Sequence, residues 1–153
     1  MSIVGHGQGL LSEVFISKGI ELDVSPLLAV LEQQFPHWVA FYLFGSHARG
    51  QATADSDVDL AVLIDGPSLD PVRVWYLAEQ LASMAGCNVD LVDLKSASTV
   101  MRYQIITQGI CLKARQPAAH VFEARVVQDK LDLDIQRGAQ MEEIQARSYV
   151  YGR

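Results

Sequence analysis

A strand that ends in Gly-Ser, followed after ten residues by a strand that begins Asp-x-Asp, constrains this chain more than any other feature. Residues 39–44, VAFYLF, form a continuous apolar run of the length of a buried strand, and Gly45-Ser46 ends it. Residues 57–64, DVDLAVLI, predict a second strand. Asp57 and Asp59 should share one face of it, because side chains two residues apart on a strand point the same way.

Helices alternate with strands through residues 25–115, which indicates an α/β (α+β) fold. The expected elements are, in chain order, a helix capped by Ser25 and stopped at Phe35-Pro36, strands 39–44 and 57–64, a helix from Asp70 to Gly86, a strand near 88–94, a helix near 97–108 and a short edge strand at 110–113. We expect a small mixed β-sheet with helices packed on it.

Two flanking segments differ from this core in character. Residues 1–24 are interrupted by glycines and predict either an arm or a helix, the latter between Leu10 and Ile20. Residues 116–153 are charged, with apolar side chains at helical spacing, and predict a helical C-terminal extension that binds a partner. Gly138 either breaks this helix or only weakens it.

Composition excludes several classes of protein. The 153 residues suit one domain, and no apolar run approaches the roughly 18 residues of a membrane span. The formal net charge is −6 and the twelve Lys and Arg residues are scattered, which argues against direct binding of a nucleic-acid polymer. The N-terminus is no secretory signal, and two cysteines give neither a disulfide framework nor a metal-ligand spacing, so we expect a cytoplasmic protein.

The aspartate pair predicts a site for Mg²⁺ and a nucleotide. Two carboxylates on one strand face need a counter-charge, and Mg²⁺ prefers one or two carboxylates together with substrate phosphates. A third carboxylate is available on the strand near 88–94, where Asp90 lies between Val89 and Leu91. Asp93 sits at the strand end, where a capping role is ordinary, so we take Asp90 as the third metal ligand or general base.

Gly45 and Ser46 fit the phosphates of the nucleotide. Glycine allows backbone to approach a ligand closely, and backbone N–H groups with the Ser46 hydroxyl could hold the terminal phosphates. Arg49 either adds charge to the leaving pyrophosphate or is a surface charge paired with Asp55. Ser56 either shapes the acidic loop around the nucleotide or is a simple turn residue.

Other conspicuous side chains have ordinary interpretations. His47 is expected to be a variable position rather than a catalytic base. We expect Trp38 and Trp75 in the core, and Cys87 and Cys111 as small buried hydrophobic residues.

The segments GSHARG, DSDVDLAVLI, NVDLVDL and RYQIITQGICL, in this order and spacing, resemble the minimal nucleotidyltransferases of the DNA polymerase β-like superfamily. The similarity covers about residues 25–115. It implies that Gly45 and Ser46 hold the triphosphate of ATP, that Asp57 and Asp59 bind two Mg²⁺ ions, and that Asp90 completes the triad.

The resemblance also implies a partner. Minimal nucleotidyltransferases are commonly paired with a HEPN-domain RNase toxin, and the characterised kind is an antitoxin that transfers AMP from ATP to a tyrosine of the toxin. The alternative is a non-catalytic antitoxin subunit that neutralises the toxin by binding. A third hypothesis, a small-molecule nucleotidyltransferase, conflicts with the lack of room for an acceptor domain.

Overall fold

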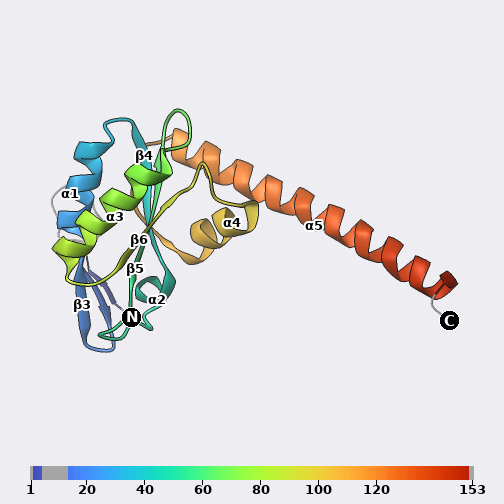
Figure 1. The fold of residues 1–153 in the computed structure, drawn as a ribbon, viewed down its shortest axis with the longest axis horizontal. Helices are drawn as coiled ribbons and strands as arrows, with labels where there is room; N and C mark the ends of the chain where they lie inside the picture. The colour runs from blue at the N-terminus through green and yellow to red at the C-terminus, as the bar shows by residue number, and fades with distance from the viewer. Residues whose placement is uncertain (1, 5–13, 152–153) are drawn as a thin grey trace.

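The computed structural model describes residues 2–4 and 14–151, which form two sheets and five helices (Figure 1). The elements are β1 (Ser2–Val4), β2 (Val14–Ser17), β3 (Ile20–Asp23), α1 (Ser25–Gln34), β4 (Trp38–Phe44), α2 (Gly45–Ala48), β5 (Val58–Ile64), α3 (Pro71–Ala85), β6 (Val89–Asp93), α4 (Thr99–Gln108), β7 (Ile110–Ala114) and α5 (Ala118–Tyr151). No helix in the described part of the chain is both long and apolar enough to cross a membrane.

The four-stranded sheet is mixed and has the strand order β6-β5-β4-β7. Strand β4 is antiparallel to both β5 and β7, whereas β5 and β6 are parallel. The expected mixed sheet is therefore confirmed. Its parallel pair requires a crossover, which α3 provides between β5 and β6.

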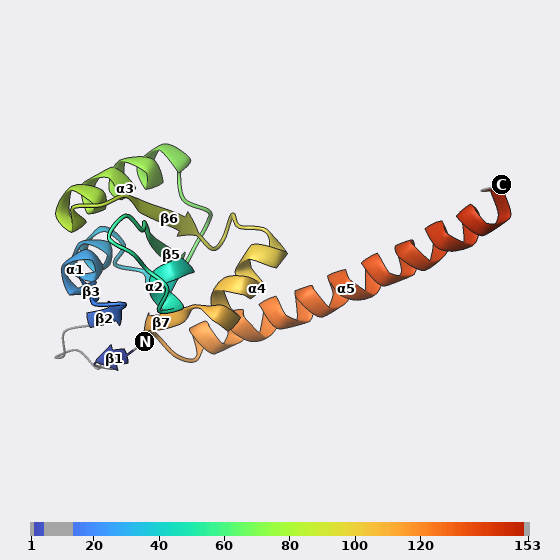
Figure 2. The same cartoon turned by 90° about the horizontal axis from the view of Figure 1, so that it is seen from below.

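Helices cover both faces of this sheet, and each face has its own apolar cluster (Figure 2). Leu60 and Val62 of β5 point toward α1 and α3, where they pack with Leu31 and Leu81. The alternate residues of β5, among them Ala61, point toward α4 and the start of α5. Every second side chain of a strand faces the same way, so alternate residues of β5 contact different helices.

Local sequence explains where the helices begin and end. Asp70 caps α3, since its carboxylate accepts a hydrogen bond from the Val72 N–H at 3.0 Å, and Pro71 occupies the first turn. Gly86 ends α3 in the left-handed conformation with φ of 72°. The expected cap at Ser25 is wrong, because Ser25 already lies inside α1 and Val24 precedes the helix.

The N-terminal segment forms strands where the structure describes it. Strands β2 and β3 pair as an antiparallel hairpin around Lys18 and Gly19, both with positive φ, and β1 pairs with β2. The helix considered between Leu10 and Ile20 does not occur at residues 14–20, and residues 10–13 lie outside the described part. Phe15 joins the apolar cluster beneath α1 and α3.

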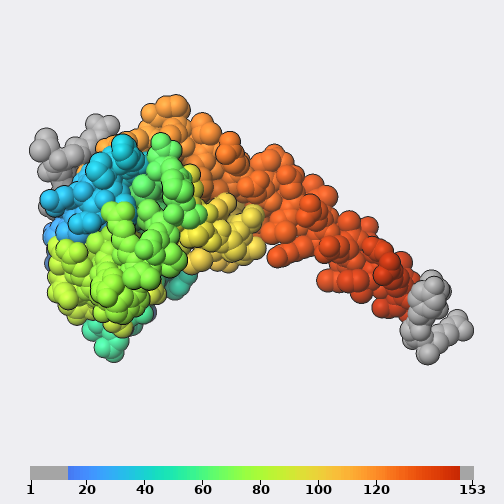
Figure 3. All heavy atoms as spheres, turned by 45° about the horizontal axis from the view of Figure 1, so that its top comes forward, coloured from blue at the N-terminus to red at the C-terminus, as the bar shows by residue number. Residues whose placement is uncertain are grey.

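Helix α5 starts on the domain and then projects away from it (Figures 1 and 3). Ala119 and Val126 are buried, and the Glu123 carboxylate accepts a 2.6 Å hydrogen bond from the buried Tyr42 hydroxyl of β4. Beyond this anchor the helix continues without interruption through Gly138. The predicted helical C-terminal extension is confirmed, and Gly138 does not break it.

Two expectations about buried side chains are wrong. Trp75 is 58% exposed, because its position on α3 faces away from Leu77 and Leu81, which pack on the sheet. Cys111 is exposed on the edge strand β7, and Cys87 is only partly buried. Trp38, by contrast, is partly buried and stacks on Phe41, with ring centroids 5.0 Å apart.

Candidate active site

Strand direction brings the Gly-Ser and Asp-x-Asp segments to the same end of the sheet. Gly45 directly follows the last residue of β4, and Asp57 directly precedes the first residue of β5. Because β4 and β5 are antiparallel, the end of one lies beside the start of the other, and Phe44 pairs with Asp59. Residues separated by a ten-residue loop therefore become neighbours.

The parallel strand β6 adds Asp90 to this edge. Asp90 is the register partner of Asp59 across the parallel pair, and both side chains lie on the α4 face because their neighbours Leu60 and Val89 point to the other face. Asp93 has a different role. It is buried, and its carboxylate accepts hydrogen bonds from the N–H groups of Leu69 at 2.8 Å and Lys95 at 3.0 Å.

Gly45 forms a close cradle for the Asp59 carboxylate. Its φ is 72°, in the region that only glycine adopts freely. A Cβ placed there would overlap Oδ2 of Asp59 and lie 2.9 Å from its Cγ. Glycine is therefore required at this position both by backbone conformation and by the space that the carboxylate fills.

The three carboxylates repel one another electrostatically. The pKa of Asp59 is raised to about 6, first by burial, then by the charge of Asp90 and a hydrogen bond to the Asp90 side chain, and then by the charge of Asp57. The charge of Arg49 opposes this rise. Like charges held this close favour a shared proton or a cation between them. The edge is thus an electronegative site with a strong preference for positive charge.

The donor set fits a magnesium ion that a nucleotide helps to hold. No three His, Cys, Asp or Glu side chains in the described residues are arranged to hold a metal ion by themselves. Mg²⁺ does not need such a cage, because it is commonly bound by one or two carboxylates plus substrate phosphates. The hydrogen-bonded pair of Asp59 and Asp90, with Asp57 adjacent, supplies carboxylate oxygens of this kind.

His47 and Ser56 link the two halves of the site. The His47 side chain is 4% exposed and is hydrogen-bonded to the backbone of Ser56, the residue before Asp57. Burial lowers the pKa of His47, and its Nδ1 has no hydrogen-bond partner among the described residues. The Ser56 hydroxyl in turn accepts a 2.8 Å hydrogen bond from the Thr53 N–H. The contact joins α2 to the residue before Asp57, which the sequence pattern did not indicate.

Arg49 lies close enough to affect Asp59 electrostatically, but it forms no salt bridge with Asp55. It follows the single turn of α2 and is exposed. Its guanidinium is thus available to a ligand at the carboxylate edge.

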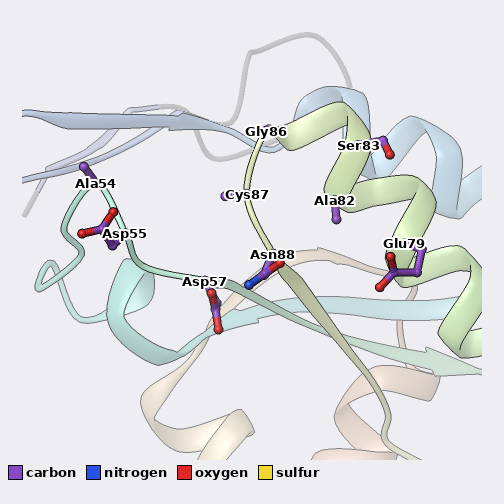
Figure 4. A pocket seen from close by; sticks show the side chains of 9 residues that line it. All are labelled: Ala54, Asp55, Asp57, Glu79, Ala82, Ser83, Gly86, Cys87 and Asn88. Carbon is purple, nitrogen blue, oxygen red and sulfur yellow. The ribbon is translucent and has the colours of Figure 1, made fainter.

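A cavity of about 510 Å³ opens beside Asp57 (Figure 4). Asp55 lines it from the loop before β5, Glu79 and Ser83 from α3, and Asn88 from the segment that enters β6. Sequence reasoning missed this cavity, because its lining combines residues 54–57 with residues 79–88, which are distant in the sequence.

Comparison with known proteins agrees with this geometry. Residues 27–118 match the family described as polymerase beta, nucleotidyltransferase. The chain belongs to the polymerase beta nucleotidyltransferase family. The resemblance found in the sequence is confirmed, and the protein is a nucleotidyltransferase.

The most similar relatives extend the match beyond the family core. The chain is 35% identical over 128 residues to protein adenylyltransferase MntA of Shewanella oneidensis, which covers 84% of this chain and 91% of the relative. A crystal structure of a toxin–antitoxin with AMP-PNP matches with a TM-score of 0.74 and 35% identity, over 81% of this chain and 99% of the other.

A second solved structure, tri-AMPylated Shewanella oneidensis HEPN toxin in complex with MNT antitoxin, matches with a TM-score of 0.66 and 34% identity. The match covers 78% of this chain and 93% of that chain. Proteins similar to this chain in fold therefore include an MNT antitoxin in complex with a tri-AMPylated HEPN toxin.

Proposed function

We propose that this nucleotidyltransferase is an antitoxin that transfers AMP from ATP to a tyrosine hydroxyl of a partner HEPN-domain RNase toxin. The observation that carries the proposal is the carboxylate edge at which Asp59 pairs with Asp90 and fits against Gly45. The similarity to protein adenylyltransferase MntA over 84% of the chain supports AMP as the transferred group.

The reaction joins the acceptor to the α-phosphate. The hydroxyl oxygen bonds to the α-phosphorus, the bond to the bridging oxygen of pyrophosphate breaks, and the hydroxyl proton leaves to Asp90 as general base. Two Mg²⁺ ions, held by Asp57, Asp59 and Asp90 with the ATP phosphates, would stabilise charge on the attacking and leaving oxygens.

Other residues bind and orient the donor. Gly45 and Ser46 hold the triphosphate through backbone N–H groups and the Ser46 hydroxyl. Arg49 places positive charge near the departing pyrophosphate. Ser56 shapes the loop that presents Asp57, through its hydrogen bond with the Thr53 N–H. Cytoplasmic location stays a prediction from the sequence.

Helix α5 is proposed to hold the partner. Its exposed side carries Val127, Leu131 and Ile135 at four-residue spacing, which we call the α5 stripe. A helix that projects from its domain gains most of its stability from packing, so an exposed apolar stripe favours coverage by another protein. The net charge of −6 suits a basic RNA-binding partner.

The test uses ATP labelled at either phosphate. With the HEPN protein encoded next to this chain and Mg²⁺, label from the α-phosphate should enter the neighbour, and label from the γ-phosphate should not. Asp57→Asn and Asp59→Asn should each abolish labelling in a folded protein. Labelling that survives both substitutions, or that comes from the γ-phosphate, refutes the proposal.

The alternative, a non-catalytic subunit that neutralises the toxin by binding, predicts that Asp59→Asn still protects cells. Truncation of α5 tests the partner contact that both mechanisms require. Removal of residues 127–153 keeps the packed Ala119 and Val126 but deletes the whole α5 stripe. The binding hypothesis predicts loss of protection in this truncated chain and retention in Asp59→Asn.

A further inference from the structure

The outward side of α3 carries large aromatic residues that the fold leaves uncovered. Trp75 is 58% exposed and Tyr76 is 65% exposed, and their rings contact each other edge to face with centroids 5.0 Å apart. Val72, one turn earlier, is also exposed. Contiguous exposed apolar side chains on a small domain mark interaction surfaces, and Trp and Tyr contribute disproportionately to binding energy.

The exposed side of α3 that carries Trp75 and Tyr76 leads along the helix to the cavity beside Asp57. Residues at positions i, i+3, i+4, i+7 and i+11 share one side of a helix, which places Val72, Trp75, Tyr76, Glu79 and Ser83 in a single stripe. We call it the α3 stripe. Glu79 and Ser83 line the cavity, and Figure 4 shows them on the α3 wall, across from Ala54 and Asp55.

The lining of the cavity favours positively charged groups. Three of its nine lining residues are acidic, namely Asp55, Asp57 and Glu79, and none is Lys or Arg. Asn88 adds an amide that can donate and accept hydrogen bonds. A segment that enters this cavity therefore gains from Lys or Arg side chains and would bring its hydroxyl group directly to a candidate catalytic carboxylate.

The cavity beside α3 and the proposed phosphate-binding residues are distinct sets of residues. Asp59 and Asp90 point to the α4 face, whereas α3 covers the opposite face, and Asp57 lies at the edge where the two meet. The nine residues that line the cavity beside α3 do not include Gly45 or Ser46, which are proposed to hold the ATP phosphates. An acceptor that enters this cavity therefore contacts residues other than the proposed phosphate site.

We propose that the α3 stripe is the docking surface for the acceptor protein, whose basic segment enters the cavity and brings its hydroxyl past Asp57 to the carboxylate edge, where Asp90 is the proposed general base. This inference rests on the proposed transferase function and assigns its acceptor specificity to α3. Helix α5 starts on the face of the sheet opposite α3 and projects away from the domain (Figure 2). The two stripes therefore contact different parts, or different copies, of the partner.

The first test measures binding without catalysis. A photo-crosslinking amino acid replaces Tyr76, and in a matched control it replaces Met84, which is also exposed on α3 but points to a different side. In the complex with the neighbouring HEPN protein and without ATP, the Tyr76 position should crosslink the partner and the Met84 position should not. Equal crosslinking at both positions, or none at Tyr76, overturns the inference.

The second test measures transfer. The double variant Trp75→Ala/Tyr76→Ala and the charge reversal Glu79→Lys should each raise the KM for the partner about tenfold or more, with the KM for ATP unchanged. Met84→Ala should leave both constants unchanged. An unchanged KM for the partner in both α3-stripe variants refutes the docking surface.

The outcomes distinguish this inference from the proposed function. Crosslinking at Tyr76 without label transfer by the wild type supports docking on α3 and contradicts the transferase proposal. Label transfer that the α3 variants do not alter supports the transferase and contradicts docking on α3. Because these side chains are exposed, their substitution should leave the fold intact, and circular dichroism checks this.

Discussion

Gly45 and Asp59 fit against each other so closely that no other residue type can occupy position 45 without displacing the carboxylate. The contact exists because β4 and β5 are antiparallel and Phe44 pairs with Asp59, which brings the Gly-Ser turn over the start of β5. One glycine thus fixes the position of a carboxylate that a metal–nucleotide complex would contact.

Gly45→Ala should lower both stability and label transfer. The matched control is Gly86→Ala, because Gly86 also has φ of 72° but nothing within 4 Å of its Cβ position. Positive φ alone costs on the order of 1–2 kcal/mol in either variant, and overlap with Asp59 adds to it only at position 45. Urea unfolding measures the difference, and equal losses would show that the contact with Asp59 is unimportant.

The pH dependence of stability should report Asp59 in the metal-free protein. Its pKa is raised from 3.8 to about 6, so the folded state binds the proton more tightly than the unfolded chain. Protonation therefore stabilises the fold below about pH 4, and this contribution is lost as the pH rises to about 6. Urea midpoints in EDTA should show the loss in the wild type.

The control for this titration is Asp59→Asn, which lacks the ionisable group. Its stability relative to the wild type should rise between pH 4 and pH 6. Mg²⁺ with a non-hydrolysable ATP analogue should reduce the wild-type loss, because a cation stabilises the ionised carboxylate. A constant difference between the two proteins across this range would contradict the assigned environment of Asp59.

His47→Ala should weaken the link between α2 and the acidic loop. The substitution removes the hydrogen bond to the Ser56 backbone and leaves a cavity at a buried site, at a cost of about 1–3 kcal/mol. Label transfer should fall while the protein remains folded. His37→Ala, at an exposed position, should change neither quantity. Full activity in His47→Ala would show that the link does not position Asp57.

Tyr42→Phe should loosen the attachment of α5. The buried hydroxyl donates a 2.6 Å hydrogen bond to Glu123, and loss of a bond to a partly buried carboxylate costs about 1–2 kcal/mol. Tyr103→Phe is the control, because the Tyr103 hydroxyl has no hydrogen-bond partner among the described residues. Equal stability of the two variants by urea unfolding would contradict an anchoring role for Tyr42.

Much of the carboxylate edge could be predicted from the sequence, because short-range patterns determine it. The Asp-x-Asp pattern indicated Asp57 and Asp59 at the start of β5, and an acidic residue between Val89 and Leu91 indicated Asp90. The close contact between Gly45 and Asp59 could not be predicted, because it depends on the register between β4 and β5.

Features that depend on distant packing could not be predicted. Trp75 fits the apolar pattern of α3 by residue type, but the sheet meets the side that carries Leu77 and Leu81. The strands at residues 14–23 were obscured by the glycines before them, and their pairing partner β1 lies ten residues upstream. The role of His47 depends on the fold of the loop that returns to Ser56.

The most direct test of the central claim is the intact mass of the neighbouring HEPN protein after co-expression with this chain. Wild-type protein should increase the mass of the partner by one or more adenylyl groups, located on tyrosine by fragmentation. Co-expression with Asp59→Asn should leave the mass unchanged, although the complex still forms. An unmodified partner in the wild-type complex, with the toxin nevertheless inactive, would contradict transfer and favour neutralisation by binding.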